Sequence, residues 1–180
     1  MLTRSRAEEI ERRAAELVQE HGTSDPELLA ERMGIMLDYA EHPSLLGFCG
    51  IMLDVPFIAL NSRADDYTLR CACAHELGHM ALGHALNGDL RVIRGSELAN
   101  MEADLEAEAN CFAAALLVSD EDALEAIHEY GDAQAVAAEL CICPELFAAK
   151  ARLLQWKGYD VHVPDMRNIG SWRDRKGRNH

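Results

Sequence analysis

Residues 70–84 read Arg-Cys-Ala-Cys-Ala-His-Glu-Leu-Gly-His-Met-Ala-Leu-Gly-His, and the rest of the chain is organised around this stretch. It has the character of a helix and contains the pattern His75-Glu76-x-x-His79. Because one helical turn separates the two histidines, both imidazoles point to the same side and can bind one metal ion. Glu76 is placed to accept a proton from a water that the metal activates. The stretch therefore predicts a zinc hydrolase, and most simply a peptidase.

Composition narrows the class of protein further. The chain has 180 residues, of which 49% are hydrophobic, which suits one domain or a compact domain with a small appendage. Its formal net charge of -14 argues against direct binding to nucleic acid. No apolar run is long enough to span a bilayer, and no basic-then-apolar leader opens the chain. We therefore expect a soluble cytoplasmic protein with no membrane contact.

The six cysteines do not indicate a disulfide framework, because no secretion signal accompanies them. Two Cys-x-Cys pairs, Cys71/Cys73 and Cys141/Cys143, could suggest a zinc cluster, but their spacing differs from the Cys-x-x-Cys of zinc knuckles. We interpret these cysteines as small apolar residues in packed segments.

Periodicity and capping residues predict an α+β fold. Helices are expected over residues 5–21, 26–33, 101–117, 120–130, 133–140 and 144–156, and strands over 35–40, 46–53, 57–61 and 159–163. The helix with the histidine pattern should start near residue 65 or 66 and end between residues 83 and 86. The first two helices should cover the sheet. The short connection before residue 57 predicts an antiparallel hairpin. The strand over 57–61 could lie at the sheet edge and bind an extended substrate by strand addition, or it could equally be a core strand with ordinary neighbours.

The acidic helix over residues 101–117 is the natural source of a third ligand. A catalytic zinc takes three protein ligands and leaves a position for water. Its candidate carboxylates are Glu102, Asp104, Glu106 and Glu108. Helical spacing places Glu102, Glu106 and Asn110 on one face, and Glu108 on another. We favour Glu106 over Glu102 and Glu108, and we expect the Asn110 amide to hold a ligating histidine in place.

Other polar residues receive no assigned role. If the helix continued, His84 would lie off the ligand face, so we interpret it as a helix-end or loop residue. An oxyanion-stabilising residue is expected but not assigned, and its candidates are Tyr67, His84, His128, Tyr130 and His162. The predicted C-terminal helix pair offers only Lys150 and Arg152 as exposed bases, which favours packing or partner binding over reading a DNA groove. Residues 87–100 are interpreted as a loop over the site.

The paired motifs resemble those of a known family. His75-Glu-Leu-Gly-His79, followed by Glu106-Ala-Glu-Ala-Asn110-Cys-Phe-Ala-Ala, is similar to the pattern of the ImmA/IrrE zinc metallopeptidases. The similarity extends over about residues 20–160. It implies a minimal thermolysin-like (gluzincin) fold, in which a three-stranded sheet packs with the two motif helices and a helix-turn-helix-like part follows. It also implies that His75, His79 and Glu106 bind one Zn²⁺ and that Glu76 is the catalytic base.

On this basis we expect a zinc peptidase domain over residues 1–118, a C-terminal helical subdomain over 119–165 and a basic, disordered tail over 166–180. The resemblance implies a substrate, a helix-turn-helix transcriptional repressor whose cleavage releases mobile-element or stress genes. One alternative is an antitoxin-like regulatory protein that binds zinc and a partner with little peptidase activity, and a weaker one is a zinc hydrolase of another substrate. The presence of Glu76 favours the peptidase.

Overall fold

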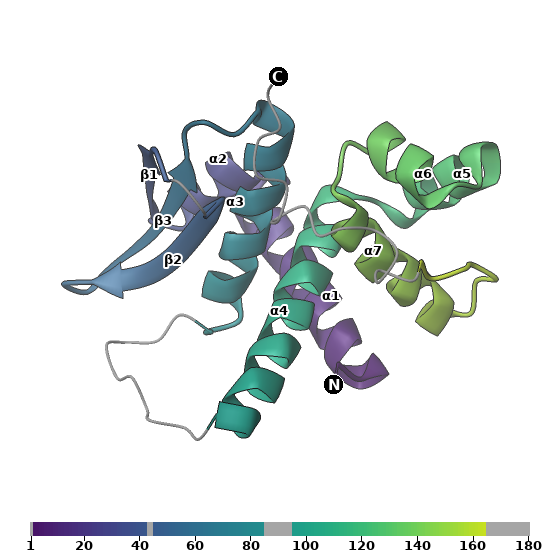
Figure 1. Ribbon diagram of the computed structural model, residues 1–180, viewed down its shortest axis with the longest axis horizontal. Coiled ribbons are helices and arrows are strands. Elements are labelled where there is room, and N and C mark those ends of the chain that lie inside the picture. The colour runs from purple at the N-terminus through teal and green to yellow at the C-terminus, as the bar shows by residue number, and fades with distance from the viewer. Residues whose placement is uncertain (1, 43–44, 85–94, 165–180) are drawn as a thin grey trace.

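The computed structural model describes residues 2–42, 45–84 and 95–164. In these ranges the chain forms seven helices and one three-stranded mixed sheet, which confirms the predicted α+β fold (Figure 1). The elements are α1 (Arg4–His21), α2 (Pro26–Arg32), β1 (Met36–Ala40), β2 (Gly47–Met52), β3 (Val55–Asn61), α3 (Asp66–Ala81), α4 (Gly95–Leu117), α5 (Asp120–Tyr130), α6 (Ala133–Glu139) and α7 (Pro144–Lys157).

Local signals explain where the helices begin and end. The hydroxyl of Ser119 accepts a hydrogen bond from the backbone N–H of Asp122 at the start of α5, and Gly131 ends that helix in the left-handed conformation. The observed bounds of α5 are therefore the predicted ones. In contrast, α4 begins at Gly95, six residues before the predicted start at residue 101. The rest of the predicted loop, up to residue 94, lies outside the described residues.

The sheet has the strand order β1-β3-β2. β2 and β3 form the predicted antiparallel hairpin, whose turn residues Leu53 and Asp54 both have positive φ, of 52° and 63°. Such turns match the right-handed twist of paired strands. β3 also pairs in parallel with β1, so it is the central strand. Of the two positions considered for residues 57–61, the edge is therefore wrong and the core is correct, because β1 and β2 take the two edges and Ile58 to Leu60 are buried.

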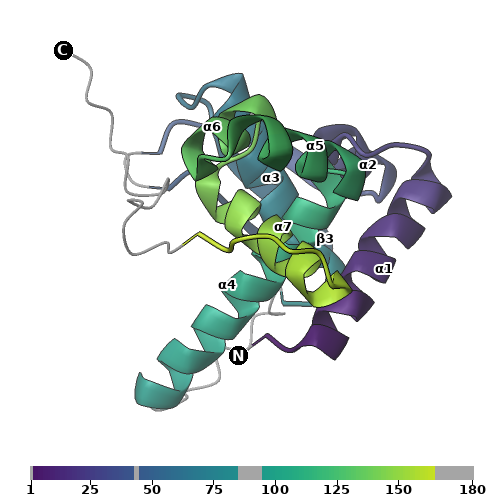
Figure 2. The same cartoon turned by 90° about the vertical axis from the view of Figure 1, so that its right-hand side faces the viewer.

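The helices form layers on one side of this sheet. α3 packs on β2 and β3, and α4 crosses α3 on the face away from the sheet (Figures 1 and 2). α2 packs on α3 and β1, as expected, whereas α1 packs mainly along α4 rather than on the sheet. α3 is therefore enclosed by the sheet and by α4. Its side chains Cys71, Cys73 and Leu77 are buried in the core.

The cysteines are free thiols, and four are buried, which agrees with a packing role for Cys71, Cys73 and Cys143 but not for the exposed Cys141. They are Cys71, Cys73, Cys111 and Cys143, while Cys49 is half-buried and Cys141 is exposed. The side chains of Cys71 and Cys143 hydrogen-bond each other, so α3 contacts the start of α7.

The C-terminal helices α5, α6 and α7 lie on the side of α4 away from the sheet (Figure 1). Lys150 was predicted to be an exposed base, and this prediction is wrong because the residue is only 2% exposed. Its ammonium group is 2.6 Å from a carboxylate oxygen of Asp120. Residues 159–163 form no strand, because the sheet lies across α3 and α4 from them; Val161 is instead buried in the core. The predicted tail over 166–180 lies outside the described residues. No helix in the described part of the chain is long and apolar enough to cross a membrane.

Candidate metal centre

α3 carries two of the predicted ligands into the interior. The helix runs from Asp66 to Ala81 and is capped by Asp65, whose carboxylate accepts a hydrogen bond from the backbone N–H of Thr68. His75 lies in the interior, with 1% of its surface exposed. A polar ring in such surroundings needs partners for both nitrogens, because an unpaired buried polar group is costly.

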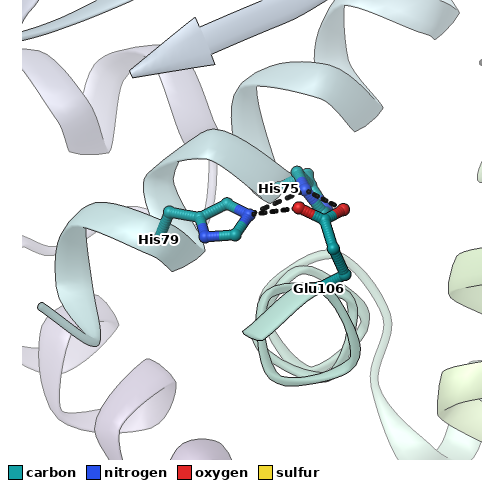
Figure 3. Close-up of side chains that lie close together, drawn as sticks. All are labelled: His75, His79 and Glu106. Carbon is teal, nitrogen blue, oxygen red and sulfur yellow. Dashed lines mark hydrogen bonds and ion pairs between the residues drawn. The ribbon is translucent and has the colours of Figure 1, made fainter. Parts of the chain in front are cut away.

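Three side chains converge at this point: His75 and His79 from α3, and Glu106 from α4 (Figure 3). The Nε2 atoms of the two histidines are 3.1 Å apart. Glu106 Oε2 is 3.5 Å from His75 Nε2, and Glu106 Oε1 is 3.3 Å from His79 Nε2. Within the described residues, these three form the one group of three or more histidine, cysteine, aspartate or glutamate side chains that could hold a metal ion.

The separations suit a tetrahedral ion. With bonds of about 2.0–2.1 Å, neighbouring ligand atoms of tetrahedral zinc lie about 3.3–3.4 Å apart. The three measured separations of 3.1, 3.3 and 3.5 Å fall around that value. Two imidazoles and one carboxylate are also a ligand set of catalytic zinc peptidases. The residues present therefore fit zinc.

Asn110 lies one turn after Glu106, where it was predicted to hold a histidine. Its side-chain oxygen is 2.8 Å from His75 Nδ1. Because an amide oxygen can only accept, Nδ1 of His75 carries the proton and Nε2 keeps a lone pair. This is the tautomer that a metal ligand of this kind requires.

Two other candidate carboxylates of α4, those of Glu102 and Glu108, lie elsewhere. Glu102 is exposed, and Glu108 faces α1, where its Oε2 accepts a hydrogen bond of 2.7 Å from Nη2 of Arg6. Burial alone would raise the pKa of Glu108, but hydrogen bonds from Arg6 and His84 outweigh burial and hold that pKa below its ordinary value. The structure thus brings Glu106, rather than Glu102 or Glu108, to the two histidines.

Glu76, the predicted base, faces strand β2. A Cβ atom on Gly47 would come within 3.2 Å of Glu76 Cγ, so this glycine leaves room for the glutamate side chain. The thiol of Cys49 donates a hydrogen bond to Glu76, and burial, followed by the charge of Glu76, raises the pKa of Cys49. Gly47 and Cys49 were not predicted to matter here, because nothing in the sequence indicates which strand lies beside α3.

His84 contacts the centre as well, which sequence reasoning missed. α3 ends at Ala81, and Gly83 adopts the left-handed conformation with φ of 74°. The chain therefore turns back, and His84 Nδ1 lies 3.2 Å from His79 Nδ1. Burial, followed by the nearby His79, lowers the pKa of His84 below its ordinary value of 6.5, so the ring is neutral at pH 7. Of the five oxyanion candidates, the structure brings His84 into contact with a predicted ligand.

A signal for this contact was present in the sequence. A glycine just after a helix commonly ends it in a turn that brings the second residue beyond the helix back toward its last turn. Gly83 and His84 occupy those positions. The prediction that His84 is a helix-end or loop residue is correct, but its placement away from the ligands is wrong because helical periodicity was carried past the glycine.

Comparison with protein families identifies one match. The chain matches the model of the IrrE N-terminal-like domain, Peptidase_M78, over residues 29–152. No curated protein matches its sequence significantly. The matched range contains α3 and the part of α4 that carries Glu106 and Asn110, so it includes all three predicted ligands.

Proposed function

This chain belongs to the IrrE N-terminal-like family of peptidases, and from that premise we propose that it is a zinc-dependent endopeptidase that cleaves a helix-turn-helix transcriptional repressor in the cytoplasm. The observation that carries the proposal is the convergence of two imidazole nitrogens and a carboxylate within 3.5 Å of one another.

The proton positions on the histidine rings support the proposal that a metal ion binds between these three residues. The side-chain oxygen of Asn110 accepts a hydrogen bond from Nδ1–H of His75, so the Nε2 lone pair of that ring points at His79 and Glu106. Lone pairs and a negative carboxylate that face one another repel, and a divalent cation between them removes the repulsion. The donor set thus favours a bound cation over a simple hydrogen-bonded cluster.

The proposed reaction is hydrolysis of a peptide bond. His75, His79 and Glu106 would hold the zinc ion, which when bound would act as a Lewis acid for the substrate carbonyl and for water. Glu76 accepts the proton of the attacking water and delivers it to the leaving amine nitrogen as the C–N bond breaks. β2 is an edge strand that passes Glu76, so its backbone is suited to receive an extended peptide by strand addition.

The charge of the chain supports the choice of substrate. A net charge of -14 disfavours contact with DNA and favours encounter with the basic surface of a DNA-binding protein. Release of mobile-element or stress genes would follow from cleavage of such a repressor.

Metal binding is tested with one variant and a matched control. The purified chain should hold about one zinc ion, and Glu106→Ala should lose most of it. Glu102→Ala removes an exposed carboxylate one turn earlier on the same helix and should leave zinc binding intact. Adding a chelator should lower the melting temperature of the parent chain, since a ligand bound only to the folded state stabilises it. Equal zinc binding by the two variants would contradict the ligand assignment.

Activity is tested with Glu76→Gln and a repressor encoded beside this gene. The variant should keep zinc and lose cleavage, because glutamine cannot accept the proton. Cleavage of the repressor by this variant would overturn the role of Glu76. A parent chain that binds zinc and the repressor without cutting it would instead support the regulatory alternative.

A further inference from the structure

A line of polar contacts runs outward from the metal centre. His84 Nδ1 lies 3.2 Å from His79 Nδ1, and His84 Nε2 lies 3.2 Å from Glu108 Oε2. Arg6 of α1 donates two hydrogen bonds to the same carboxylate oxygen, at 2.7 and 3.1 Å. The His84 side chain is 6% exposed and that of Glu108 is 17% exposed, so water competes little for these contacts.

We propose that His84 is a positioning residue for the metal centre, which holds the ring of His79 in the tautomer and orientation that a metal ligand needs. The proposal rests on the proposed function in one respect, namely that His79 binds a metal. It adds His84, and behind it Glu108 and Arg6, to the residues that build the site.

The backbone brings His84 to this position. After α3 ends, the N–H of His84 donates to the carbonyl oxygen of His79 at 2.8 Å, and the N–H of Gly83 donates to that of Met80 at 3.2 Å. This pair of bonds is the Schellman turn, which needs a left-handed residue such as Gly83 and places its last residue against the final turn of the helix. The two rings meet nearly edge to face, with centroids 5.2 Å apart.

The contacts agree with the proton positions that metal binding by His79 requires. A histidine that binds a metal through Nε2 carries its remaining proton on Nδ1, so the Nδ1–H of His79 donates to Nδ1 of His84. The proton of His84 then lies on Nε2, which donates to the Glu108 carboxylate. Nε2 of His79 faces His75 and Glu106, where the metal would bind. His84 thus does for His79 what Asn110 does for His75.

Glu108 and Arg6 fix the outer end of the line. Glu108 lies two residues after Glu106 on α4, so the two carboxylates leave different faces of one helix. Glu106 approaches Nε2 of His79, whereas Glu108 approaches the Nδ1 side through His84. Arg6 lies outside the matched range of residues 29–152, so α1 supplies a contact that the family model does not cover.

The experiment measures zinc affinity by competition with a chromophoric chelator. His84→Ala should weaken zinc binding about 10- to 100-fold, the usual effect of removing an outer partner of a metal-bound histidine. His84→Asn keeps an acceptor oxygen close to the position of Nδ1 and should recover most of the affinity. His128→Ala, at an exposed position on α5, is the matched control and should bind zinc as the parent chain does.

Two further readouts separate positioning from packing. Circular dichroism and urea unfolding of the metal-free variants establish that each is folded. In the parent chain, nitrogen NMR of His79 should show the proton on Nδ1, and cobalt substitution should give a d–d spectrum that changes in His84→Ala and returns in His84→Asn.

The outcomes are distinct. Parental zinc affinity in folded His84→Ala would overturn the positioning role and leave the proposed function standing. Equal weakening in the alanine and asparagine variants would also overturn it, because only packing would then be involved. A parent chain that binds no zinc would overturn both proposals.

Discussion

Replacing Gly78 by alanine should separate α3 from α4 and damage the metal centre. Gly78 lies in the Leu-Gly of the His-Glu-Leu-Gly-His pattern, where α3 crosses α4. A Cβ atom built on it would lie 3.0 Å from the backbone oxygen of Ala109, 3.2 Å from its Cα and 3.2 Å from Cβ of Phe112. Backbone atoms cannot rotate away, so the helices would have to move apart by about 0.4 Å to restore ordinary contact.

The magnitude follows from two opposing terms. Overpacking of a well-filled contact costs about 1–3 kcal/mol, while alanine in place of glycine in a helix contributes about 1 kcal/mol. We therefore expect Gly78→Ala to lower the free energy of unfolding by about 1 kcal/mol. His75 and His79 share α3, but Glu106 lies on α4, so among the three ligands the movement lengthens the distances to Glu106. It also lengthens the contact of Asn110, on α4, with His75. Because metal sites tolerate distance changes of only about 0.2 Å, zinc affinity should fall about tenfold.

Urea unfolding of the metal-free protein measures the first effect, and chelator competition measures the second. Ala109→Gly is the matched control at the same crossing. It removes a methyl group and costs about 1 kcal/mol in helix propensity, but it does not push the helices apart, so zinc affinity should be kept. If Gly78→Ala were about 1 kcal/mol more stable and bound zinc like the parent chain, the tight crossing would be refuted.

Two further predictions concern stability away from the metal. Asp120→Asn should lower the free energy of unfolding by about 2 kcal/mol at pH 7, because it leaves the Lys150 ammonium buried without a carboxylate. The loss is moderate because the Asp120 side chain is 30% exposed. Although burial alone would raise the pKa of Asp120, hydrogen bonds from Lys150 and Lys157 hold it below its ordinary 3.8. The stabilisation is therefore present above pH 3.8 and is lost as the pH falls through the lower pKa of the folded state. The difference in free energy of unfolding between parent and variant, measured with urea, should shrink toward pH 3. A difference that stays constant with pH would contradict the assignment. Ser119→Ala removes the cap of α5 and should lower the free energy of unfolding, measured by thermal denaturation, by about 1 kcal/mol without changing zinc affinity. A variant as stable as the parent chain would show that the cap is dispensable.

Much of the fold was predictable because its signals are local. Ser119 and Gly131 mark the two ends of α5, and the bounds of that helix were predicted correctly from them. The hairpin of β2 and β3 was predicted from its short connection for the same reason. The order of the strands was not predictable, because a hydrophobic pattern indicates that a strand is buried but not which strands pair with it.

The errors at the C-terminus have a similar origin. Residues 159–163 have a strand-like composition, but no sheet edge is within reach, and Val161 is buried against helices instead. Lys150 looked exposed because lysine almost always is, and only the distant Asp120 makes its burial tolerable.

By itself the sequence determined the helix of the metal centre, since the four-residue spacing of His75 and His79 needs nothing beyond that helix to place both rings on one side. It also favoured Glu106, because helical periodicity separates that residue from Glu108. Only the tertiary structure decided that Glu106 comes within 3.5 Å of both histidines, since that distance is set by the crossing of α3 and α4 at Gly78. The tertiary structure likewise decided that His84 faces His79, because the chain turns back at Gly83, whereas helical periodicity assumes that the helix continues.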